Sequence, residues 1–167
     1  MEQRDEWKEQ GHVEALIREA RVVMLTTEAP DGTLRSRPMA VLQDRLDDGC
    51  LWFFTERHSG KTDEVRQEHQ VCVAYASPEK ESYLSISGTA EVVDDRRKAE
   101  QLWRPAARAY FPRGPQDPAL TLLRVRVETA EYWDGASSRM VQLIKFARAI
   151  LTGTQPDLGE HGKLTPR

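Results

Sequence analysis

Six short segments rich in β-branched, aliphatic and aromatic residues are separated by turn-forming sequences, and this alternation constrains the fold most strongly. The segments are Val22–Thr27, Thr33–Gln43, Cys50–Thr55, Val71–Ala76, Tyr83–Val93 and Leu122–Trp133. The first three are separated by Asp31-Gly32 and Asp47-Asp48-Gly49, sequences that are typical of tight turns. Short strands in a meander-like order, with helical stretches between them, favour an antiparallel barrel over a parallel α/β sheet.

Two of these segments also indicate their place in the sheet. Val71–Ala76 is almost entirely apolar, which is typical of a central strand. Pro38 has no amide hydrogen to donate to a neighbouring strand, so the segment around it is expected at an edge or locally broken. Along that segment Arg37 and Met39 share one face, because successive side chains on a strand point to opposite faces.

Four further segments have the apolar spacing of amphipathic helices. They are Asp5–Ala20, Lys61–Glu68 with Ser59 as its N-cap, Asp94–Trp103 and Ser138–Leu151. The sequence therefore predicts a mainly β protein with short peripheral helices. We expect a single domain over residues 1–152 and an extended tail over residues 153–167.

Composition and residue usage exclude several classes of function. The chain has 24 basic and 27 acidic residues, which does not suit a protein that binds the nucleic-acid backbone. No apolar run approaches the roughly 20 residues that cross a bilayer, and the N-terminus lacks the pattern of a secretion signal, so we expect a cytoplasmic protein. Cys50 and Cys72 and the four dispersed histidines indicate neither a disulfide framework nor a metal site.

The first candidate binding site lies between Phe54 and Lys61. Thr55 ends a predicted strand, Ser59 caps the following helix, and Lys61 lies in its first turn. Unpaired amide donors and the helix dipole both favour an anion at such a position, and phosphate suits it well. A capped surface helix with a solvated lysine is the structural alternative. The chain lacks the P-loop pattern of nucleotide-binding proteins.

Two other residues have both a functional and a structural interpretation. A charged side chain such as Arg37 is costly within a strand unless it is solvated or paired. Either a bound anion or a carboxylate of the chain would provide that pair, and the sequence leaves both open. Trp133, beside Asp134-Gly135, offers a flat apolar face to a ring-shaped ligand. It could equally be a core or interface residue.

Taken together and in this order, the motifs resemble the FMN-binding split barrel of the pyridoxamine 5'-phosphate oxidase-like superfamily, and within it the general stress protein 26 group. The resemblance is carried by Leu25-Thr26-Thr27, Asp31-Gly32, Ser36-Arg37-Pro38-Met39, Leu51-Trp52-Phe53-Phe54-Thr55, Ser59, Lys61, Ser87-Gly88-Thr89-Ala90, Tyr132-Trp133-Asp134-Gly135 and Gly159-Glu160-His161-Gly162. It implies a six-stranded antiparallel split barrel, an FMN cofactor, and a homodimer whose cofactor sites lie at the interface.

The resemblance also implies roles for individual residues. Arg37 and Lys61 would bind the phosphate of FMN, and Thr55 and Ser59 would add hydroxyl donors. Three residues would lie along the flavin: Pro38, Met39 and Phe54. Trp133 matches a tryptophan that the oxidases contribute across the dimer interface.

The sequence departs from the pattern of the oxidases at three positions. Gly60 replaces an arginine before the lysine, so one phosphate contact is missing, and Val141 and Leu143 replace a histidine and an arginine. Because a pyridoxal phosphate ligand loses polar partners with these changes, we expect a flavin-dependent oxidoreductase with another small-molecule substrate. The alternatives are a non-enzymatic stress protein that binds or senses flavin, and a barrel that holds a related cofactor such as the deazaflavin F420.

Overall fold

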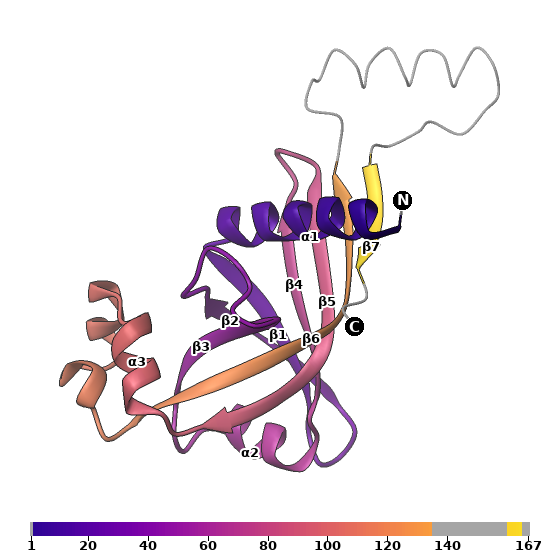
Figure 1. Cartoon of the computed structure of the whole chain (residues 1–167). Helices are drawn as coiled ribbons and strands as arrows, with labels where there is room; N and C mark the ends of the chain where they lie inside the picture. The colour runs from indigo at the N-terminus through magenta and orange to yellow at the C-terminus, as the bar shows by residue number, and fades with distance from the viewer. Residues whose placement is uncertain (1, 135–159, 165–167) are drawn as a thin grey trace, which may run out of the picture.

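The computed structural model describes the backbone of residues 2–134 and 160–164, and the side chains of residues 11–133 and 163. In this part of the chain seven antiparallel strands form one curled sheet (Figure 1). They are β1 (Val22–Glu28), β2 (Leu34–Ala40), β3 (Cys50–Glu56), β4 (Gln70–Ser77), β5 (Ser82–Val93), β6 (Leu120–Asp134) and β7 (Glu160–Leu164). The first six confirm the predicted six-stranded antiparallel half-barrel.

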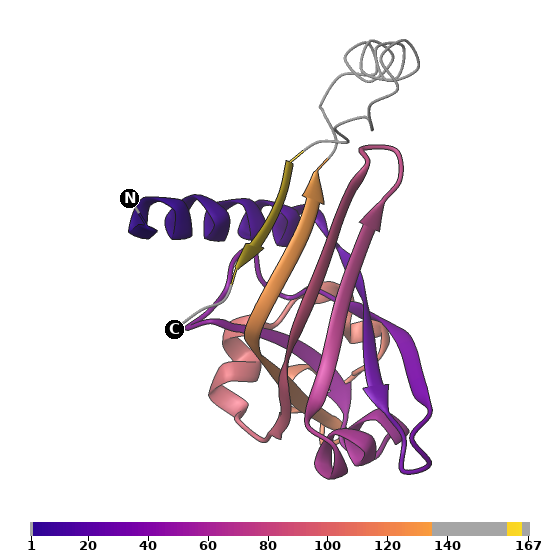
Figure 2. The ribbon, with the colours of Figure 1, turned by 90° about the vertical axis from the view of Figure 1, so that its right-hand side faces the viewer.

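Helices surround this sheet, as the sequence predicts. The α-helices are α1 (Glu2–Glu19), α2 (Gly60–Gln67) and α3 (Arg96–Leu102), and the 3-10 helices are η1 (Pro105–Ala109) and η2 (Gly114–Gln116). Figures 1 and 2 show α1 lying across the long strands near one end of the sheet, whereas α2 lies at the opposite end. None of the described helices is long and apolar enough to cross a bilayer.

The strand order is β2-β1-β4-β5-β6-β3, which differs from the predicted meander. β3 does not continue beside β2 but pairs with β6 over its whole length, from Cys50 opposite Arg126 to Glu56 opposite Leu120. The turn residues before β3 specify only local geometry and do not reveal this distant partner. As a result, β2 and β3 become the two ends of the strand path.

β5 and β6 are the longest strands and hold the two parts of the barrel together. On one edge of β6, residues 120–126 pair with β3 and residues 130–134 pair with β7. The pairing of β5 with β6 shifts register between Ser87 and Gly88, so that Glu128 of β6 has no partner on β5. At this irregularity a Cβ on Gly88 would lie 2.1 Å from the carbonyl oxygen of Arg126. Only glycine permits this close approach of two strands.

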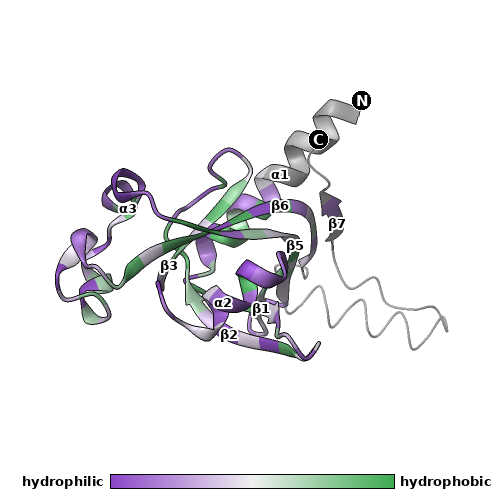
Figure 3. Cartoon of the chain, turned by 90° about the horizontal axis from the view of Figure 1, so that it is seen from below, coloured by the Kyte–Doolittle hydropathy of each residue, from purple (hydrophilic) through white to green (hydrophobic). Residues whose placement is uncertain are grey.

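β3 separates two hydrophobic cores. Leu51 and Phe53 belong to the core inside the barrel, whereas Trp52 belongs to a second core with Phe111. Alternate side chains of a strand point to opposite faces, so a strand covered on both sides must be apolar throughout, which explains the sequence of β3. Figure 3 shows hydrophobic residues concentrated along the strands and hydrophilic residues on α2.

Several local predictions are confirmed with small shifts in their bounds. Pro38 lies on the edge strand β2, β4 lies between β1 and β5, and α2 begins directly after Ser59. The barrel core also includes Val13 from the apolar face of α1. The predicted helix over Ser138–Leu151 and the predicted domain boundary at residue 152 lie outside the described residues.

Candidate functional site

A cavity of about 710 Å³ is lined by β2, β3, the first turn of α2, the C-terminal end of α1 and η1. Small-molecule sites typically measure about 300–1,000 Å³. Five of the predicted flavin-binding residues line this cavity: Pro38, Met39, Phe54, Thr55 and Lys61. The structure thus brings together residues from three separate segments of the sequence, and the cavity is the candidate site.

β2 contributes its backbone edge to this cavity. Within the described sheet it pairs with β1 alone, so the backbone groups along its other edge have no strand partner. Successive residues from Pro38 to Gln43 line the cavity, as expected where a strand presents its edge rather than one of its faces. Such amide and carbonyl groups can hydrogen-bond the polar edge of a planar ligand.

Thr55 lines the cavity and carries a buried hydroxyl group. The residue is 3% exposed, and its Oγ1 is buried without a hydrogen-bond partner among the described residues. Most buried polar atoms in proteins have a partner, because an unpaired one carries a desolvation cost. A ligand oxygen in the cavity would provide that partner, so this part of the site suits a phosphate.

Lys61 brings an unpaired positive charge to the same part of the cavity. Its ammonium forms no hydrogen bond or ion pair with the described residues, and burial lowers the pKa of Lys61. Nearby Arg37 lowers this pKa as well, whereas Glu56 and Glu64 raise it. An anion beside Lys61 would oppose the effect of burial and favour the charged form.

Ser59 stabilises the start of α2 and does not line the cavity. Its backbone N–H donates to Thr62 Oγ1 at 3.0 Å, and its hydroxyl lies 3.3 Å from the carbonyl oxygen of Glu56 as a donor. These contacts confirm the predicted N-cap position and fix Lys61 in the first turn of the helix. The predicted contact between Ser59 and a phosphate stays a prediction.

Arg37 is held by a buried carboxylate rather than pointing freely into the cavity. Its Nη2 donates to Glu64 Oε2 at 2.8 Å, and its Nη1 donates to the hydroxyl of Thr27. Arg35 adds a 3.1 Å contact from Nη1 to Glu64 Oε1. Of the two partners that the sequence left open for Arg37, the structure shows the carboxylate of the chain. The predicted contact between Arg37 and a phosphate stays a prediction.

Glu64, which holds Arg37 beside the cavity, is a residue that the sequence did not single out. It is 4% exposed, and the Thr27 hydroxyl donates to its Oε2 at 2.5 Å. Burial raises the pKa of Glu64, but hydrogen bonds from Thr27 and Arg37 and the two arginine charges outweigh it, so the pKa lies below its ordinary value. The sequence near Glu64 indicates only that it lies three residues after Lys61. Its hydrogen-bond partners lie on β1 and β2, so the local sequence does not reveal them.

Trp133 lies on β6, outside the cavity, on an apolar face of the sheet. Strand pairing places it opposite Tyr83, and four large side chains that share this face are exposed: Val22, Met24, Tyr83 and Trp133. We refer to these four residues as the outer apolar face. Exposed apolar patches of this kind are typical of contact surfaces.

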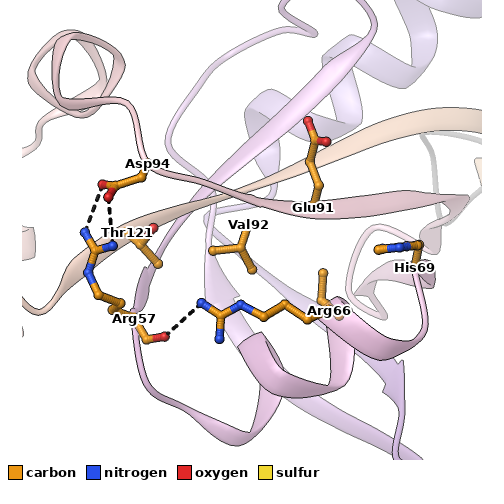
Figure 4. Close-up of a pocket in the computed structure, with 8 residues that line it drawn as sticks. Arg57, Arg66, His69, Glu91, Val92, Asp94 and Thr121 are labelled. Carbon is orange, nitrogen blue, oxygen red and sulfur yellow. Dashed lines mark hydrogen bonds and ion pairs between the residues drawn. The ribbon is translucent and has the colours of Figure 1, made fainter.

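A second hollow of about 320 Å³ lies between α2 and β5 (Figure 4). Its arginines already have partners within the chain. Arg57 forms two contacts with Asp94, at 2.8 and 2.9 Å, and Arg66 contacts Asp63 at 3.0 Å and the carbonyl oxygen of Arg57 at 3.4 Å. These contacts join the ends of β3 and β5 to α2. The arginines of this hollow therefore have a structural role.

Comparison with known proteins gives one family match and several similar structures. The family described as "Pyridoxamine 5'-phosphate oxidase like" matches residues 8–157. Protein bli-3 of Neurospora crassa is 28% identical over 139 residues, which cover 78% of this chain and 66% of that protein. The chain therefore spans slightly less than two thirds of this relative.

Two solved structures illustrate the structural similarity. A candidate general stress protein 26 from Jannaschia sp. CCS1 has a TM-score of 0.76 at 25% identity, with 96% of this chain and 99% of that chain covered. The general stress FMN/FAD binding protein of Xanthomonas citri has a TM-score of 0.67 at 30% identity, with 79% and 92% covered. Both support the split-barrel fold.

Proposed function

Because the chain belongs to the pyridoxamine 5'-phosphate oxidase-like family, we propose that it binds FMN in the 710 Å³ cavity and acts as a flavin-dependent oxidoreductase. One observation carries this proposal. Thr55 and Lys61 line the same cavity, and neither the buried Thr55 hydroxyl nor the Lys61 ammonium has a partner among the described residues. Related proteins support it as well, since one similar structure is named as an FMN/FAD binding protein.

The residues of the cavity fit the two chemically different parts of FMN. Lys61 and Thr55 would hold the phosphate, which carries a charge between about −1.5 and −2 at neutral pH. Ser59 lies close to the phosphate position because it directly precedes the first turn of α2. Arg37 lies close to it because its ion pair with Glu64 holds it against the same helix. Pro38, Met39 and Phe54 would lie along the ring system, where apolar contacts and the free edge of β2 suit a planar cofactor.

When bound, the flavin would supply hydride or electron transfer, and the protein would supply binding and orientation. Lys61 and the N-terminus of α2 would fix the phosphate, while the edge of β2 would orient the ring. The substrate is expected to be a small molecule other than pyridoxamine phosphate, since Val141 and Leu143 occupy positions where the resemblance implies polar partners of that ligand.

A homodimer belongs to the same proposal. The outer apolar face exposes Val22 by 53% and Met24 by 41%, and it continues across the sheet to Tyr83 and Trp133. A second copy of the chain packed on this face would remove these side chains from water. As the resemblance implies, Trp133 would then contribute to the site of the other subunit.

One observation favours a non-enzymatic flavin-binding protein as the second candidate. Among the described residues that line the cavity, none is a histidine or a cysteine, so this wall lacks a side chain that ordinarily titrates near neutral pH. A carrier or sensor of flavin needs no such group.

The chromophore and its turnover test these alternatives. The purified protein should show flavin absorbance, and acid release should yield FMN as identified by chromatography. Reduction of the bound flavin by NADH or NADPH, followed by reoxidation with an added acceptor, would support the enzyme. Bound FMN that is never reduced or reoxidised at a useful rate would support the carrier instead.

A further inference from the structure

The candidate cavity has positive charges on elements other than α2. Besides Lys61, three basic residues line it: Arg18, Arg21 and Arg104. We refer to the part of the cavity wall that they form as the arginine end. Arg18 lies in the last turn of α1, Arg21 lies two residues after that helix ends, and Arg104 directly precedes η1. The lining acids are Asp44 and Glu56, so the cavity has two more basic than acidic side chains.

The three arginines have no ion-pair partner among the described residues. This distinguishes them from Arg57, which is bound by Asp94, and from Arg37, which is bound by Glu64. Several positive charges that share one cavity without a carboxylate partner raise the local potential and favour an external anion there.

Arg104 is the best positioned of the three. Its Nη2 donates to the carbonyl oxygen of Leu42 at 3.1 Å, and its Nε lies 3.4 Å from the same oxygen as a donor. This carbonyl holds one side of the guanidinium group at the cavity wall. Because an arginine has five N–H donors in a rigid fork, further donors remain available to a carboxylate.

Apolar and aromatic side chains surround the arginine end of the cavity. Phe111 is buried, and Tyr110 is 78% exposed, so its ring is accessible to a ligand. Leu42 adds an aliphatic wall. The combination of a fixed guanidinium group and an apolar surface suits a molecule with one anionic group on a flat, apolar body.

We propose that the arginine end of the cavity binds the substrate, and that the substrate is a small organic anion whose carboxylate contacts Arg104. The proposal rests on the proposed function, in which FMN occupies the end at Lys61. The phosphate of a bound flavin would neutralise the positive charge of Lys61. The three arginines would then still be able to bind a second anionic ligand in the same cavity.

Two matched probes test the requirement for a negative charge. 2-Naphthoate and its neutral amide have the same ring system, and calorimetric titration into the FMN-loaded protein measures their affinities. We expect naphthoate to bind about tenfold or more tightly than naphthamide, as a charge-assisted hydrogen bond provides. We also expect naphthoate to perturb the visible spectrum of the flavin. Equal affinities, or no binding of naphthoate at millimolar concentration, would overturn the proposal.

Variants then separate this subsite from the flavin site. Arg104→Gln should weaken naphthoate about tenfold and leave the affinity for FMN within about twofold. Arg108→Gln is the matched control, because Arg108 lies on η1, which directly follows Arg104, but does not line the cavity. Loss of FMN affinity in Arg104→Gln would instead make Arg104 a flavin ligand and contradict the substrate assignment.

The naphthoate titration is repeated on flavin-free protein. This repeat distinguishes failure of the proposed FMN binding from failure of the proposed anion subsite. If the wild-type protein binds no FMN, the proposed function fails, and Arg104-dependent binding of naphthoate still decides whether the anion subsite exists. If FMN binds but naphthoate does not distinguish Arg104→Gln from Arg108→Gln, the proposed function stands and the substrate subsite is refuted.

Discussion

Glu64 on α2 accepts a hydrogen bond from Arg37 on β2 at 2.8 Å, and this ion pair joins α2 to the edge strand of the sheet. The carboxylate is almost fully buried, whereas the Arg37 side chain is 22% exposed. Thr27 and Arg35 complete the environment of Glu64. The pair therefore fixes the strand that lines the cavity against the helix that presents Lys61.

Replacing Glu64 with glutamine should destabilise the protein by about 2 kcal/mol or more, because one member of a largely buried ion pair loses its charge. Asp63→Asn is the matched control on the same helix, since Asp63 forms only an exposed pair with Arg66. That control should change the free energy of unfolding by at most about 1 kcal/mol. Urea denaturation measures both. Equal effects would show that the Glu64 pair has no special role.

The same ion pair predicts how stability depends on pH. The pKa of Glu64 in the folded protein lies below its ordinary value of 4.5, so its ionised form stabilises the fold at pH values above about 4.5. This contribution is lost as the pH falls through the folded pKa. The difference in unfolding free energy between wild type and Glu64→Gln should therefore be largest near pH 7 and shrink below pH 4.5. A difference that is constant from pH 7 to pH 3 would contradict this.

Thr55→Val should have opposite effects on stability and on ligand binding. Valine removes a buried hydroxyl that has no partner among the described residues, so the flavin-free protein should become more stable by about 1 kcal/mol. Affinity for FMN should fall several-fold because a donor to the phosphate is lost. Thermal unfolding and fluorescence titration measure the two effects, with Thr55→Ser as the control that retains the hydroxyl. A valine variant that binds FMN as tightly as wild type would exclude Thr55 from the site.

Met24→Lys should disrupt the proposed dimer. Met24 is 41% exposed on the outer apolar face, so a charge there can be solvated in a monomer but would be buried without a partner in a dimer. Light scattering should show a dimer for wild type and a monomer for Met24→Lys, with unchanged circular dichroism. Gln67→Lys, on the exposed side of α2, should remain dimeric. A monomeric wild-type protein at micromolar concentration would refute the assembly.

The fold was predictable where the information is local. Alternating apolar residues identified six strands, Pro38 identified an edge, and Ser59 identified the start of a helix. The pairing of β3 with β6 was not predictable in this way, because about seventy residues separate the partners and no turn joins them. β7 was also missed, since Glu160–Leu164 is polar and pairs only with the end of β6.

The candidate site was predictable to a similar extent. Thr55 and Lys61 were recognisable because a strand end and a helix start bring them together within a few residues. The partner of Arg37 was not, since Glu64 looks like any helical glutamate until the fold places α2 against β1 and β2. Arg104 was missed for the same reason: its cavity exists only after the segment following α3 returns to β2.

The affinity for FMN compared with riboflavin, measured by fluorescence titration in wild type and Lys61→Ala, tests the central claim most directly. Riboflavin lacks the phosphate, so loss of Lys61 should weaken FMN about tenfold or more and change riboflavin by less than about twofold. Lys80→Ala, which removes an exposed lysine from outside the cavity, should leave both unchanged. Absence of FMN binding by wild type at micromolar concentration, or equal losses for both ligands in Lys61→Ala, would contradict a flavin phosphate site at Lys61.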